Sequence, residues 1–161
     1  MKTPGFPSKL VCLLLLMVGS ASSQQITVQN DQSGHVVLSA ADIAALPHTI
    51  VKVNGHDGTA TYSGVPVATL LEKAGITFGE SLRGKRLASC LLVEAADGYR
   101  VVIALPELDP GFTDKQILLA DKPETHPLDD KDGPYRIVIP DEKRMARWVR
   151  QVKTLKIVDV Q

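Results

Sequence analysis

The chain has few aromatic residues, few cysteines and no excess of charge of either sign. Aromatic side chains make up 4% of its 161 residues, which disfavours a surface of stacked rings for nucleobases or sugars. Lysine plus arginine and aspartate plus glutamate number 18 each, and this balance disfavours a nucleic-acid-binding protein. The two cysteines are Cys12 and Cys90. The composition therefore indicates neither a disulfide-rich scaffold nor a surface for polyanions.

The longest apolar run is short and lies near the N-terminus. Lys2 and Lys9 precede it, residues 11–18 form it, and small residues follow up to Ser23. This pattern predicts a signal peptide over residues 1–23, because the run is too short to span a bilayer comfortably. A retained membrane anchor is the less favoured alternative. No Arg-Arg pair precedes the run, which indicates general secretion rather than twin-arginine export. We expect a periplasmic or secreted protein with no stable membrane span after cleavage.

Cleavage after Ser23 would leave residues 24–161, which suffice for one domain with a real core. It would also remove Cys12 and leave Cys90 as the single cysteine. An exported domain with one cysteine forms no internal disulfide, so its stability must come from packing.

Short β-branched runs, punctuated by turns, indicate many strands and few helices. Ser39 is the expected N-cap of a helix over residues 40–46, and Gly75 ends a second helix over residues 67–74. A short helix or loop is expected at 106–112 and a helical turn at 147–151. The fold class is therefore α+β, with a mixed, mostly antiparallel sheet core and short helices. Strands are expected at 26–28, 36–38, 49–53, 59–62, 87–95, 100–105, 117–120, 136–140 and 155–160.

Three motifs occur in an order that is found in a known family. Residues 62–75 read YSGVPVATLLEKAG, and residues 97–99 form a D-G-Y turn between two apolar runs. Residues 133–140 read GPYRIVIP and are followed by R-W-V at 147–149. Together these motifs resemble the molybdopterin-binding domain of the sulfite oxidase superfamily over roughly residues 40–160. The resemblance implies that fold, with a pocket around an anionic pterin cofactor.

The resemblance also implies a cysteine thiolate on molybdenum, upstream of the helix motif. The matching stretch, His48–Gly55, contains no cysteine, although a soft metal needs a soft anionic ligand. Cys90 lies downstream in an apolar run, where we interpret it as a small buried core residue. The four histidines show no metal-site spacing. We therefore expect no bound molybdenum, with molybdopterin possible from the resemblance alone.

Unlike the cysteine segment, the basic residues near the C-terminus match the residues that line the anion-binding part of the family's pocket. Arg136 matches the arginine of the family's P-x-R strand, and Arg147 stands where the family has a lysine before tryptophan. Lys143 and Arg144 add charge in the preceding loop. Arginine can hold a phosphate or a carboxylate through two parallel hydrogen bonds. The candidate residues for ligand binding are Tyr99, Arg136, Lys143 and Arg147; we expect no catalytic residue.

Three functions stay open. The leading hypothesis is a binding module for a small anionic ligand or a protein partner. The alternative is a molybdopterin-dependent oxidoreductase, with Cys90 or no protein thiolate on the metal. The third is an accessory subunit, which an exposed apolar patch around Trp148 would favour. The basic residues themselves have a simpler interpretation, as solvated charges paired with Asp141 and Glu142.

Overall fold

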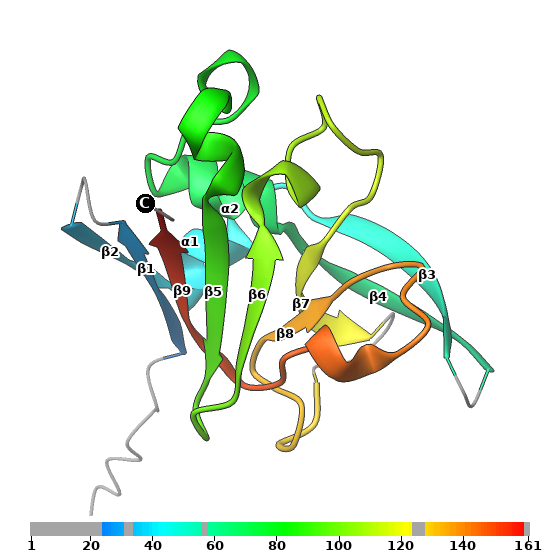
Figure 1. The fold of residues 1–161 in the computed structure, drawn as a ribbon. Helices are drawn as coiled ribbons and strands as arrows, with labels where there is room; N and C mark the ends of the chain where they lie inside the picture. The colour runs from blue at the N-terminus through cyan, green and yellow to red at the C-terminus, as the bar shows by residue number, and fades with distance from the viewer. Residues whose placement is uncertain (1–23, 31–33, 56–57, 124–127, 160–161) are drawn as a thin grey trace, which may run out of the picture.

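The strands form two sheets, which stand side by side in Figure 1. The computed structural model describes residues 24–30, 34–55, 58–123 and 128–159. Within these residues β1 pairs with β9 in parallel, and the other paired strands are antiparallel. The predicted class, a mixed and mostly antiparallel α+β fold, is confirmed. The predicted signal peptide, residues 1–23, lies outside the described residues.

The larger sheet has five strands in the order β2-β1-β9-β5-β6. Its strands alternate between buried and more exposed side chains, as expected for a sheet with one face on the core. In β5, for example, Leu91 and Val93 are fully buried, whereas Leu92 and Glu94 are partly exposed. The strands are β1 (Gln25–Asn30), β2 (Gly34–Ser39), β5 (Cys90–Ala95), β6 (Arg100–Ala104) and β9 (Val152–Val158).

The smaller sheet has four strands in the order β3-β4-β7-β8. A β-bulge between Ser63 and Gly64 interrupts the pairing of β4 with β7. A side chain at position 64 would place its Cβ 2.3 Å from the Leu119 carbonyl oxygen, so the close approach of the two strands requires glycine. The strands are β3 (Thr49–Gly55), β4 (Gly58–Pro66), β7 (Leu118–Pro123) and β8 (Arg136–Val138).

Two α-helices and four 3-10 turns connect the strands. Helix α1 (Ala40–Ala44) begins with a capping box, in which Ser39 and Asp42 each satisfy the other's backbone N–H. Helix α2 (Val67–Lys73) ends before Gly75, whose positive φ of 88° suits glycine. The 3-10 turns are η1 (Gly79–Ser81), η2 (Gly84–Ala88), η3 (Leu105–Glu107) and η4 (Met145–Arg147).

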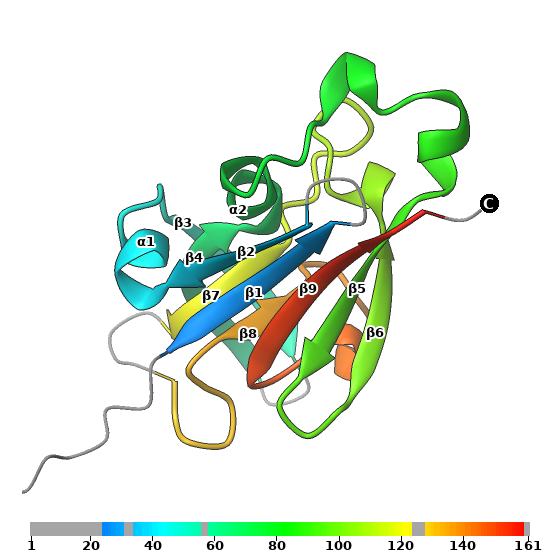
Figure 2. The same cartoon turned by 90° about the vertical axis from the view of Figure 1, so that its left-hand side faces the viewer.

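The core lies between the two sheets. Figure 2 shows the five-stranded sheet in front of the four-stranded sheet. Ile26, Leu91 and Leu155 from the first sheet, and Val65 and Leu119 from the second, are fully buried. Full burial stabilises a side chain of this size by about 1.5–3 kcal/mol, so packing can hold the fold together without a disulfide.

Several predicted elements have different bounds in the structure; the strand predicted at 155–160, for example, begins at Val152. The strand predicted at 87–95 begins only at Cys90, because residues 84–88 form the turn η2. The helix predicted at 40–46 ends at Ala44, and the helical turn predicted at 147–151 lies at 145–147. Beyond η4 the pattern continues because Trp148 and Val149 are buried in the following loop, whereas Leu87 of η2 is 42% exposed.

Among the residues that the structure describes, no helix is long and apolar enough to cross a membrane.

Candidate functional site

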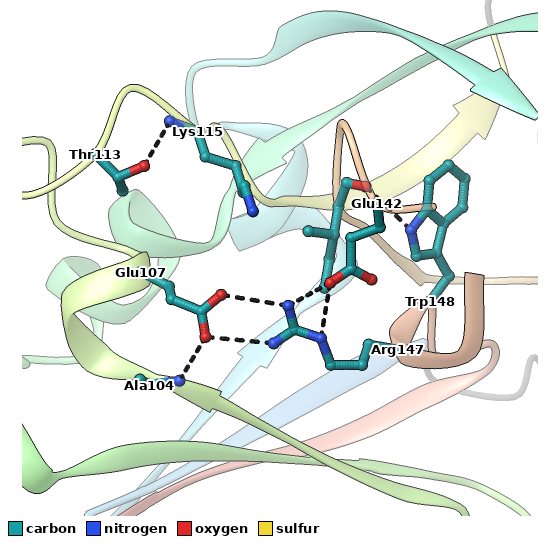
Figure 3. A network of polar contacts seen from close by, with 8 residues as sticks. Ala104, Glu107, Thr113, Lys115, Glu142, Arg147 and Trp148 are labelled. Carbon is teal, nitrogen blue, oxygen red and sulfur yellow. Dashed lines mark hydrogen bonds and ion pairs between the residues drawn. The ribbon is translucent and has the colours of Figure 1, made fainter. Parts of the chain in front are cut away.

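Arg147 lies at the end of η4, between two carboxylates that come from different parts of the chain. Its Nε donates a 2.8 Å hydrogen bond to Glu142 Oε1, and its Nη2 donates to the same oxygen. On the other side Nη1 and Nη2 donate to the two oxygens of Glu107, each at 3.3 Å. Figure 3 shows the guanidinium between the two acids. The guanidinium therefore links η3 to the loop before η4.

Glu107 is held in its charged form by this arrangement. Burial opposes its ionisation, but hydrogen bonds from Arg147 and from the Ala104 N–H, with the charges of Arg147 and Lys115, outweigh burial and lower the pKa of Glu107. Hydrogen bonding to Glu107 in turn raises the pKa of Arg147 above its usual value. The pair is therefore fully ionised at neutral pH.

A shallow, open hollow of about 440 Å³ lies beside Arg147. Figure 3 shows the side chain of Lys115 pointing toward the Arg147 cluster. Four cationic side chains and two carboxylates line this hollow, and Glu107 also pairs with Arg147. The remaining excess of one positive charge favours an anion. The lining residues are Lys115, Asp141, Glu142, Lys143, Arg144 and Arg147.

Arg136 does not line this hollow. Its side chain is 13% exposed and forms an ion pair with Asp132. The guanidinium carbon lies 5.8 Å from the ring centroid of Tyr62 and 5.5 Å from that of Trp148, within the range of cation–π attraction. The two rings meet edge to face, with centroids 5.9 Å apart. Arg136 is thus packed between aromatic rings and neutralised by one acid.

Tyr99 borders a separate hollow on the other side of η4. Its hydroxyl donates a 2.8 Å hydrogen bond to the Ala146 carbonyl, and Tyr99 lines that hollow with Met145 and Trp148. Trp148 itself is 5% exposed and donates from Nε1 to the Ile139 carbonyl at 3.1 Å. Trp148 itself is therefore not part of an exposed patch, whereas its neighbours Tyr99 and Met145 are 50% and 40% exposed.

The structure thus brings together two of the four candidate residues, Lys143 and Arg147, and places Arg136 and Tyr99 apart from their hollow. Pairing of Arg147 with Glu142 agrees with the simpler interpretation of the basic loop. The sequence analysis missed Glu107 and Lys115, because no local pattern links them to residues some 30 to 40 positions away.

Cys90 is not the buried core residue that the sequence suggested. It is partly exposed, because the alternation of β5 places it on the same face as Glu94. Desolvation, followed by the charge of Asp159, raises the pKa of its thiol. The thiol is therefore protonated at neutral pH and is a poor nucleophile.

Comparison with known proteins assigns the fold to a family. Residues 44–161 match the model of the oxidoreductase molybdopterin binding domain, so the chain belongs to that family. The fold is similar to the crystal structure of the sulfane dehydrogenase SoxCD from Paracoccus pantotrophus, with a TM-score of 0.66 and 19% sequence identity. The match covers 84% of this chain but 38% of that chain. No curated protein sequence matches significantly.

The side chains offer partners for an anionic group of a molybdopterin cofactor, but they are less suited to its metal. The hollow beside Arg147 offers cations for an anionic group. Strand β3, which spans most of the stretch matched to the family's cysteine segment, offers no sulfur, and Cys90 lies on the other sheet. The stretch matched to the family's cysteine segment therefore offers no thiolate for molybdenum.

Proposed function

We propose that this protein is an exported member of the family that binds a small anionic ligand in the hollow beside Arg147. In this proposal no protein thiolate holds molybdenum. The observation that supports it most is the convergence of Lys115, Lys143, Arg144 and Arg147 on one hollow, against the carboxylates of Asp141 and Glu142. The ligand is a phosphate- or carboxylate-bearing small molecule, and a pterin is one example of it.

The geometry also suggests how an anion would enter. The bonds from Arg147 to Glu107 are 3.3 Å long, and the Glu107 side chain is 35% exposed. An exposed pair of this kind contributes about 0–1 kcal/mol, so an incoming phosphate can replace Glu107 at little cost. Glu142 is only 13% exposed and would keep the guanidinium oriented while the ligand binds.

A molybdopterin-dependent oxidoreductase is the second candidate, because the chain belongs to a family of molybdopterin-binding domains. The structural neighbour is the sulfane dehydrogenase SoxCD. By analogy the chain could act with a partner subunit, but a fold shared at 19% identity does not transfer an activity. The absence of a cysteine in residues 48–55 favours the binding module.

Titration calorimetry with inorganic pyrophosphate tests the module. We expect saturable binding that weakens with added salt, because opposite charges attract less when screened. Replacing Lys143 and Arg144 with alanine should weaken binding at least tenfold. The control pair, Arg83 and Lys85, carries the same charges, lies on the exposed surface around η2 and away from the hollow, and should have no effect. Equal losses in both double variants, or no saturable binding by the unaltered protein, would contradict a site at this hollow.

A further inference from the structure

A second polar site lies in the four-stranded sheet, where the bulge of β7 brings an aspartate next to a histidine. Consecutive residues of β4, Ser63 and Gly64, pair with Lys122 and Ala120 of β7, so Asp121 has no partner in the ladder. A bulge of this kind re-aims the side chain of the extra residue. The carboxylate of Asp121 reaches His48, 3.2 Å from Nε2 to Oδ2.

Both ring nitrogens of His48 face acceptors. Nδ1 lies 2.8 Å from the carbonyl oxygen of Leu46, and Nε2 lies 3.2 Å from Asp121 Oδ2. A carbonyl oxygen only accepts, so the proton of that first bond must lie on Nδ1. A neutral imidazole has one N–H, so the bond to Asp121 requires a further proton between Nε2 and Oδ2. The arrangement is complete only when the pair holds that proton.

The surroundings favour the protonated pair, which has no net charge, over the deprotonated pair, which carries one negative charge. Asp121 Oδ1 is buried and has no hydrogen-bond partner among the described residues. The charge of Asp121 is the second cause, after burial, of a raised pKa at Tyr135. Tyr135 and Lys122 line a hollow of about 290 Å³ with Asp121. A deprotonated pair would leave one uncompensated negative charge in this environment.

We propose that His48 and Asp121 form a pH-sensitive clasp, which joins the connection between α1 and β3 to the bulge of β7. With the proton bound, an imidazolium pairs with a carboxylate; the two side chains are 24% and 27% exposed. Without it, Nε2 presents a lone pair to a carboxylate oxygen, and the contact becomes repulsive. The clasp is therefore closed while the shared proton is bound, and it opens when a rise in pH removes that proton.

The position of the clasp gives it a consequence for β3. His48 directly precedes this edge strand, and Gly64 lies in register between Thr49 of β3 and Ala120 of β7. With both nitrogens occupied, His48 is neither a free base nor a metal ligand. Opening the clasp would loosen the start of β3 without altering the hollow beside Arg147.

Urea unfolding at pH 5.5 and pH 8.5 tests the clasp on the whole chain and on two variants, His48→Gln and Asp121→Asn. Between pH 5.5 and pH 8.5 we expect the unfolding constant of the unaltered protein to rise about tenfold more than the unfolding constant of either variant. A factor of this size corresponds to the loss of one charge-assisted hydrogen bond. The control is His35→Gln, an exposed histidine on β2; this variant should keep the full pH dependence. An equal pH dependence in the unaltered protein and in His48→Gln overturns the proposal.

Nitrogen-15 NMR of the unaltered protein supplies a second test, in case a variant fails to fold. We expect the His48 ring to show the shifts of an imidazolium at pH 5.5 and of a neutral ring with Nδ1–H at pH 8.5. A ring that is neutral at both pH values and that does not exchange a proton with Asp121 overturns the clasp.

Discussion

Replacing Arg147 with methionine should destabilise the protein by about 2 kcal/mol, because two carboxylates lose a shared partner. Glu142 is 13% exposed, and a charge-assisted hydrogen bond of such a group contributes about 1.5–3 kcal/mol. Glu107 is 35% exposed and its bonds are 3.3 Å long, so we assign its pair with Arg147 at most about 0.5 kcal/mol after solvent screening. Methionine retains an apolar side-chain stem, so the loss is limited to the charge and its hydrogen bonds.

Thermal and urea unfolding at pH 7 measure this loss. For a chain of this size, about 2 kcal/mol corresponds to a fall in Tm of roughly 6–8 °C. Arg147→Lys is the matched control, because it keeps the charge and loses the fork that reaches both acids; its loss should be intermediate. A change below about 0.5 kcal/mol in Arg147→Met would show that the guanidinium does not link η3 to the loop before η4.

The same network predicts a pH dependence with a definite sign. Because the folded-state pKa of Glu107 is lowered, its contribution is present above the pKa of an unfolded glutamate, about 4.3. The contribution is lost as the pH falls through the lowered folded-state value. The stability difference between the unaltered protein and Arg147→Met should therefore shrink below about pH 4. A difference that is constant down to pH 2 would contradict the assignment.

Three further predictions concern other positions. Gly64→Ala should destabilise by about 3 kcal/mol in urea unfolding, because its Cβ would lie 2.3 Å from the Leu119 carbonyl oxygen; a loss below about 0.5 kcal/mol would mean that the strands separate freely. Trp148→Phe should cost about 2 kcal/mol by the same assay, because the Ile139 carbonyl loses its donor; unchanged stability would contradict this. The thiol of Cys90 should react with iodoacetamide at pH 7 at least tenfold more slowly in the folded than in the urea-unfolded protein, because its pKa is raised; equal rates would refute this.

Local signals in the sequence were sufficient for much of the fold. Ser39 and Asp42 identify the start of α1 because a capping box involves residues three positions apart. The apolar spacing of residues 67–74 identifies α2 for a similar reason. The sequence does not predict that β1 pairs in parallel with β9, because this contact joins the two ends of the domain and has no local signature.

The candidate site was only partly predictable for the same reason. Arg147 was found through its motif, but Glu107 lies 40 residues away on another turn. Arg136 also belongs to the motif, yet its surroundings depend on Tyr62 of β4 and on Trp148. The exposure of Cys90 could have been found from the alternation of β5, because Glu94 lies on the same face. The apolar neighbours of Cys90 suggested burial instead.

We propose that the chain binds an anion in the hollow beside Arg147 and holds no molybdenum through a thiolate. The most direct test is elemental analysis for molybdenum, with fluorescence of oxidised pterin, on protein purified from the exported fraction of its native host. We predict far less than one molybdenum per chain, whether or not a pterin is released. About one molybdenum and one pterin per chain would contradict the claim and make the molybdopterin-dependent oxidoreductase the function to pursue.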